Sequence, residues 1–165
     1  MSRRAESLAE RIEKGAAGLA AFAESLSDAE WNRPLSDGSD RRPIGVIVNH
    51  VAFVYPIEVD AARGIASGKE VGVSWEDIAQ LNAKHASDNA RASKADTIAL
   101  LRSNARAAAD AVRQMTDEQL DTAAPFGLSY GAPVTAQFVI EDHALRHSWH
   151  HLAKIRKALG KVNAH

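Results

Sequence analysis

Apolar residues recur every three or four positions along most of this chain, a spacing typical of helices that bury one face. Four stretches carry the pattern: residues 4–26, 43–66, 74–115 and 134–159. Alternation with a period of two, which is typical of strands, is nearly absent. Four amphipathic helices of this length bury their apolar faces best against one another. We therefore predict an all-α protein with the architecture of a four-helix bundle.

The third stretch and the segment that follows it need a more detailed prediction. The 74–115 stretch contains no Gly or Pro, and it can form one helix or two with a break near Ser93. Residues 122–133 contain two Pro and two Gly, so we expect the longest irregular segment there. The chain shows no internal repeat, low-complexity tract or linker. We predict a single domain over residues 1–165.

Composition narrows the classes of function. The chain has 20 Lys and Arg against 21 Asp and Glu and no long basic run, which argues against nucleic-acid binding. We find no apolar stretch of about 18 residues and expect no membrane span. Residues 1–14 lack the apolar core of a secretory signal, so we expect a cytoplasmic protein. The absence of cysteine excludes thiolate ligands and a thiol nucleophile of the protein itself, so any thiol must arrive with a substrate.

Four of the seven histidines lie in the last predicted helix: His143, His147, His150 and His151. At about 100° per residue, His151 lies nearest the apolar face and His147 lies beside it. His143 and His150 turn toward the polar side, where we expect them to be solvated. Two imidazoles one helical turn apart can reach a single metal ion. We predict that His147 and His151 form such a pair, the alternative being two ordinary polar-face histidines.

The second predicted helix adds a histidine and a carboxylate. His50 lies at the margin of its apolar face, where a hydrogen-bonded core histidine is the simplest interpretation. Glu58 lies near the middle of that face, and a carboxylate there is costly unless it is paired. Its partner can be an arginine, or Glu58 can be the acceptor that orients a ligand histidine. His85, in the third stretch, can line the mouth of a pocket or face water.

Three motifs occur in a characteristic order along the chain. They are DAEWNRPL at residues 28–35, RPIGVIVNHVAFV at 42–54 and HSWHHLAKI at 147–155. Their order and spacing resemble the DinB/YfiT-like family of four-helix-bundle proteins, and the resemblance covers nearly the whole chain. It implies a metal held by one histidine of the second helix and two of the last, which correspond here to His50, His147 and His151. Lys154 departs from the pattern, because many relatives have Gln at this position at the rim of the site.

Three imidazole ligands leave the fourth position of a tetrahedral metal open, as in catalytic sites. We expect a divalent ion, Zn or Ni, which lowers the pKa of bound water or thiol. The resemblance implies a metal-dependent enzyme similar to the family's thiol-dependent S-transferases, with a low-molecular-weight thiol and an electrophilic substrate as partners. Hydrolysis and thiol-dependent isomerisation belong to the same class. Glu58 and His143 are the candidates for a catalytic base.

Two other hypotheses stay open. In the first, the protein is a stress-linked module that binds metal without catalysis, which a fourth position closed by His143 or Glu58 would indicate. In the second there is no metal, and the clustered histidines make the helix packing sensitive to pH. The resemblance also raises the expectation of a homodimer, since relatives often pair through helix faces.

Overall fold

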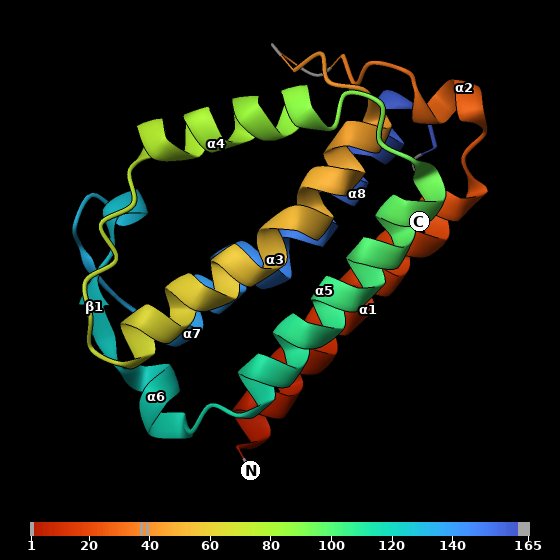
Figure 1. Cartoon of the computed structure of the whole chain (residues 1–165). Coiled ribbons are helices and arrows are strands. Elements are labelled where there is room, and N and C mark those ends of the chain that lie inside the picture. The colour runs from red at the N-terminus through yellow and green to blue at the C-terminus, as the bar shows by residue number, and fades with distance from the viewer. Residues whose placement is uncertain (1, 37, 39, 162–165) are drawn as a thin grey trace.

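The computed structural model describes residues 2–36, 38 and 40–161. Its bundle is formed by α1 (Arg3–Ser25), α3 (Ile44–Ala66), α5 (Lys94–Arg113) and a last segment made of α7 (Ala136–Val139), η2 (Ile140–Leu145) and α8 (Arg146–Ala158). Helix α5 packs between α1 and α3, and the last segment closes the bundle by packing against α1 and α3 (Figure 1). The predicted all-α four-helix bundle is confirmed.

The shorter elements connect the bundle helices: α2 (Asp28–Trp31), α4 (Trp75–Asp88), α6 (Asp117–Asp121), β1 (Ala123–Pro125), η1 (Gly127–Ser129) and β2 (Pro133–Thr135). The 74–115 stretch forms two helices, because the Ser93 side chain accepts a hydrogen bond from the Asp96 N–H and caps α5. Helix α4 lies outside the bundle, across α3 (Figure 1). The segment predicted to be irregular contains the antiparallel pair β1 and β2, whose three-residue strands are too short to show a period of two.

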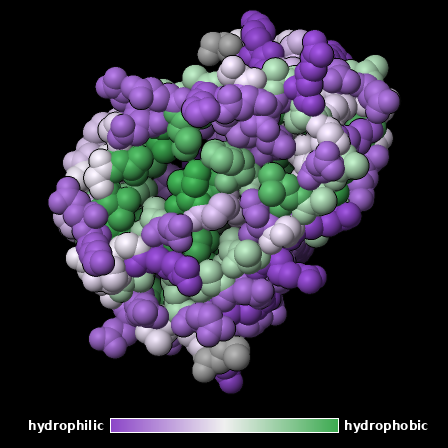
Figure 2. Space-filling model, in the orientation of Figure 1, coloured by the Kyte–Doolittle hydropathy of each residue, from purple (hydrophilic) through white to green (hydrophobic). Residues whose placement is uncertain are grey.

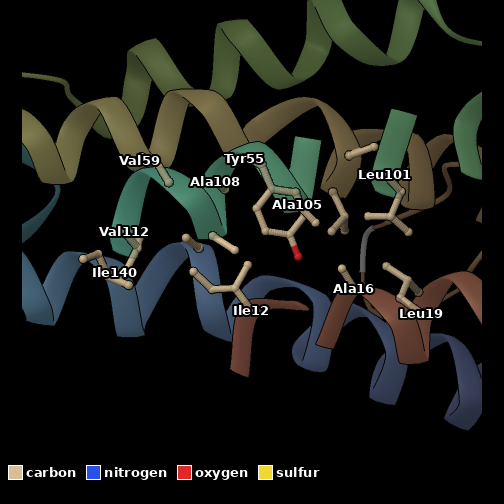
Figure 3. Close-up of a cluster of buried hydrophobic side chains, with 14 of the residues drawn as sticks. Ile12, Ala16, Leu19, Tyr55, Val59, Leu101, Ala105, Ala108, Val112 and Ile140 are labelled. Carbon is tan, nitrogen blue, oxygen red and sulfur yellow. The ribbon is translucent and has the colours of Figure 1, made fainter. Parts of the chain in front are cut away.

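The core lies where α1, α3, α5 and the last segment meet (Figure 3). Ile12, Tyr55, Leu101 and Ile140 come from these four segments and are fully buried. The Tyr55 hydroxyl shares a hydrogen bond with the hydroxyl of Ser148 on α8. This bond satisfies a buried polar group and fixes α8 against α3 between two of its histidines.

The tryptophans divide between core and surface. Trp31 is buried, and the ring lies so close to α3 that a Cβ on Gly45 would come within 2.3 Å of it. Trp75 and Trp149 are 52% and 42% exposed. Both lie on helix faces that the bundle leaves partly uncovered.

Helix α3 corrects the expectation that no apolar stretch is long enough for a membrane span. By length and composition Ile44–Ala66 passes that test, with a mean hydropathy of 1.3 over its best window. In the structure, however, 72% of that window is buried inside the protein. A helix that crosses the centre of a bundle needs an apolar surface on several sides, so this composition is that of a core helix.

Pro56 lies inside α3 and has no N–H to donate to the carbonyl of Ala52, one turn earlier. The side chain of Asn104 on α5 donates from Nδ2 to that carbonyl oxygen at 2.9 Å. Asn104→Leu keeps the side-chain size and removes the donor, so we expect it to lower the free energy of unfolding by about 1–2 kcal/mol. Urea denaturation measures this, with the exposed neighbour Ser103→Ala as the control. Equal midpoints for the two variants would contradict the prediction.

Candidate metal centre

His50 on α3 and His147 and His151 on α8 come together at one side of a cavity. One ring nitrogen of each lies within 4.8 Å of the other two, and Nε2 of His50 is 3.1 Å from Nε2 of His147. His50 is 5% exposed and His151 is 9% exposed. The structure therefore brings together the three residues that the family resemblance implies. Their binding of a metal stays a prediction.

The protonation of the two buried rings fits a metal site. Burial, reinforced by the neighbouring His147, lowers the pKa of His50 to about 3 and that of His151 to about 2. Both rings are thus neutral at pH 7, and a histidine ligand must be neutral to offer its lone pair. Imidazole nitrogens held this close together form a donor set suited to Zn or Ni.

Glu58 determines how the ring of His147 is used. Its Oε1 accepts a hydrogen bond from Nδ1 of His147 at 2.6 Å, and the carboxylate is buried. A proton fixed on Nδ1 leaves the lone pair on Nε2, the atom that faces His50. Of the two partners considered for Glu58, the structure has the histidine: the carboxylate orients His147, one of the predicted ligands. Such partners of ligand histidines also raise their basicity.

The cavity beside the histidines has a volume of about 540 Å³, within the range of small-molecule sites. The last segment of the bundle supplies one polar side, which includes Asp142, His143 and Arg146. Helix α4 and the loops near η1 supply an apolar side. Figure 2 shows apolar side chains gathered around a hollow between α4 and α3.

The prediction that His143 is solvated is wrong. The side chain is half-buried, lines the cavity and places its ring edge-to-face with Phe126, with centroids 5.5 Å apart. Burial lowers its pKa. The physical reason is local: η2 is a π-helical turn, which is wider than an α-helical turn, so residues before α8 do not follow the 100° rotation.

The last segment of the bundle begins at Ala136, capped by the Thr135 side chain, and not at residue 134.

Both predictions for His85 are wrong, because it neither lines the cavity mouth nor faces water. It is 4% exposed, and its Nε2 is 2.8 Å from Oδ1 of Asn49, whose amide donates to the hydroxyl of Thr97. His150 is exposed, as predicted, at the edge of the cavity. Lys154, expected at the site rim, is half-buried and is not among the described residues that line the cavity.

Two arginines that the sequence reasoning missed also line the cavity, Arg42 and Arg146. Arg42 binds Asp40 through two nitrogens, at 3.0 and 2.8 Å. Arg146 lies 3.3 Å from Asp142 on the same helical segment. No pattern of apolar and polar positions marks either residue, since both occupy ordinary polar positions.

The metal-free protein is expected to lose stability as the pH falls below about 6.5. His50 and His151 stay neutral in the folded state down to about pH 3 and 2, whereas unfolded histidine takes up a proton near pH 6.5. The unfolded state therefore binds more protons between these values, and each ring removes up to about 1.4 kcal/mol per pH unit. Denaturation with chelator at several pH values measures the slope. The slope of His151→Leu should be shallower, and an equal slope would contradict the argument.

The fold and the site together define a helical bundle that presents three histidines, two buried and one half-buried, to a cavity. The chain belongs to the DinB superfamily, whose family model matches residues 11–155, so the resemblance seen in the motifs is confirmed. YfiT from Bacillus subtilis has a similar structure, with a TM-score of 0.76 and 19% sequence identity over 98% of this chain and 89% of that chain. YfiT is described as "a probable metal-dependent hydrolase with an unusual four-helix bundle topology". A comparison with curated proteins finds no match.

Proposed function

We propose that the protein is a metal-dependent enzyme that joins a low-molecular-weight thiol to an electrophilic substrate. In this proposal His50, His147 and His151 hold a divalent ion, Zn or Ni. The observation that carries the proposal is the placement of three imidazole nitrogens within 4.8 Å of one another beside a cavity of about 540 Å³. Structural metal sites are closed by four protein ligands, whereas catalytic sites keep a position for water or substrate. The description of YfiT as probably metal-dependent supports the same class.

Each residue of the site has a definite task in this proposal. Burial keeps His50 and His151 unprotonated at neutral pH, and Glu58 holds the proton of His147 on Nδ1 so that Nε2 stays available. A divalent ion on such ligands supplies Lewis acidity, which lowers the pKa of a thiol or of water. The apolar side of the cavity limits the entry of water. His143, on the polar side, is the candidate to hold or pass a proton.

The cavity favours a thiol over water as the nucleophile. A free thiol has a pKa near 8.5 and water one of 15.7, so a thiol ionises with less help from a base. The carboxylates nearest the histidines are already engaged, since Glu58 accepts from His147 and Asp142 pairs with Arg146. The chain has no cysteine, so the thiol arrives as a co-substrate. Its sulfur bonds to the electrophilic carbon, the thiol proton is released, and the leaving group departs with the electrons of its bond.

Neither residue that could close the fourth position joins the histidine group in the part of the chain that the structure describes. Glu58 is occupied by His147, and His143 lies against Phe126. This arrangement supports an open position and an enzyme over a module that only stores or senses metal. A reduced thiol co-substrate is a compound of reducing compartments, so the proposal includes a cytoplasmic location.

The test is turnover by protein loaded with Zn or Ni, with and without chelator. We would combine glutathione, bacillithiol or mycothiol with 1-chloro-2,4-dinitrobenzene and follow the thioether, and assay ester hydrolysis in parallel. The proposal expects thioether formation that depends on metal and thiol together. Metal-dependent ester hydrolysis in the absence of thiol would show that the nucleophile is water rather than a thiol. Protein with a full equivalent of metal and no turnover in either assay would favour a non-catalytic module.

A further inference from the structure

Five apolar side chains line the cavity from segments outside the bundle, and we call them the apolar wall. They come from the segment between α3 and α4, from α4 itself and from η1: Val71, Val73, Ile78, Leu81 and Leu128. None of these segments belongs to the four bundle helices. The wall therefore lies on segments outside the four bundle helices, and Val71, Val73 and Leu128 pack against the edge of the core.

Backbone hydrogen bonds hold this wall in place. The N–H of Val71 donates to the carbonyl of Pro125 at 3.0 Å, and the N–H of Gly127 donates to the carbonyl of Val71 at 2.8 Å. The indole of Trp75 at the start of α4 donates to the carbonyl of Leu128 at 3.1 Å. The two chain segments approach so closely that a Cβ on Gly127 would lie 2.1 Å from the carbonyl oxygen of Val73. The segments that carry the wall are therefore held together without a bound ligand.

Both arginines that line the cavity already have partners. Arg42 pairs with Asp40 and Arg146 with Asp142, while Glu58 accepts a hydrogen bond from His147 and Asp60 lies 3.9 Å from Arg63. In the metal-free protein an anionic molecule would therefore have to give up its hydration without gaining an unpaired arginine, which is unfavourable. A neutral molecule incurs no such cost, and it gains by burying apolar surface against the wall.

We propose that the electrophilic substrate is a neutral molecule with a compact apolar body, an aryl or branched alkyl group, that packs on the apolar wall. Its reactive carbon then faces His50, His147 and His151 across the cavity. This inference rests on the proposed function, because the bound molecule is a substrate only if the protein is an enzyme. The binding of the apolar body itself does not depend on the metal, so the two proposals can fail separately.

Two fluorescent probes with the same aromatic framework test the inference. N-phenyl-1-naphthylamine is neutral, and 8-anilino-1-naphthalenesulfonate carries a sulfonate. We expect saturable binding of the neutral probe, at least about tenfold tighter than that of the sulfonate. Equal or tighter binding of the sulfonate would overturn the preference for a neutral ligand.

Variants on α4 locate the binding surface. Ile78→Asp places a carboxylate on the wall and is expected to weaken the neutral probe at least about tenfold, whereas Ala79→Asp, exposed on the same helix, should change it less than about twofold. Leu81→Asn is the second wall variant, expected to weaken the probe as well, and circular dichroism checks that each variant folds. Unchanged probe binding in both wall variants would overturn the proposal.

Wild-type protein stripped of metal by a chelator separates the two proposals. It should bind the neutral probe as well as the metal-loaded protein does, because the wall lies on segments that hold no metal. Probe binding at the wall by a protein without turnover would leave the apolar-body inference standing and remove the enzymatic function. If Ile78→Asp left turnover unchanged, the enzymatic function would stand and the apolar-body inference would be wrong.

Discussion

The His151→Ala protein is expected to retain almost no metal, whereas wild-type protein should hold about one equivalent. Within the described residues, His151 supplies one of the three nitrogens of the group, and we expect the two that remain to bind a divalent ion too weakly to retain it through purification. The loss should be specific to this position. His150→Ala removes the adjacent histidine of the same helix, which is exposed and outside the group, and should keep its metal.

Mass spectrometry of untagged protein, purified without a nickel column, measures the metal content of both variants. Thermal unfolding of the metal-free proteins provides the folding control, since a misfolded variant would lose metal for an unrelated reason. Equal metal content in His151→Ala and wild type would contradict the three-histidine site. Equal loss in His151→Ala and His150→Ala would show that the measurement reports on the helix and not on the ligand.

Glu58→Gln should weaken metal binding by about 10- to 100-fold while leaving the three ligand histidines in place. The amide oxygen can still accept the hydrogen bond from His147 Nδ1, so the tautomer is kept. The negative charge is lost, however, and with it the support that a carboxylate gives to a ligand histidine across their 2.6 Å hydrogen bond. The change therefore acts on the strength of the ligand rather than on its position.

Competition with a chromophoric zinc chelator measures this affinity. Asp60→Asn, also a cavity-lining residue of α3, removes an equal charge from an exposed side chain that does not contact a histidine of the group. It should stay within about twofold of wild type because solvent screens an exposed charge. If Glu58→Gln and Asp60→Asn behave alike, then the hydrogen bond between Glu58 and His147 has no role in metal binding.

The bundle was predictable because its helices bury one face each, and that burial leaves a period of three to four in the sequence. Residues 4–26 and 43–66 match α1 and α3 to within one residue at each end. The position of α4 was not predictable. Its apolar residues have ordinary helical spacing, and nothing in that spacing distinguishes a helix inside the bundle from one that lies across α3.

The site was predictable only as far as regular helical geometry holds. His147 and His151 are one turn apart on α8, and the pairing survives in the structure. His143 lies in the π-helical turn, where the rotation per residue differs, and its burial was missed for that reason. His85 was missed because its partner Asn49 lies on another helix. The apolar wall joins segments far apart in sequence through backbone hydrogen bonds that no side-chain pattern records.

X-ray absorption at the metal edge of zinc- or nickel-loaded protein tests the central claim most directly, because it counts the ligands and distinguishes sulfur from nitrogen and oxygen. We predict three imidazole nitrogens and a further light ligand in the resting protein, and a sulfur at about 2.3 Å after a low-molecular-weight thiol is added to the zinc form. A spectrum with four protein ligands that the thiol leaves unchanged would contradict an open, thiol-accepting site.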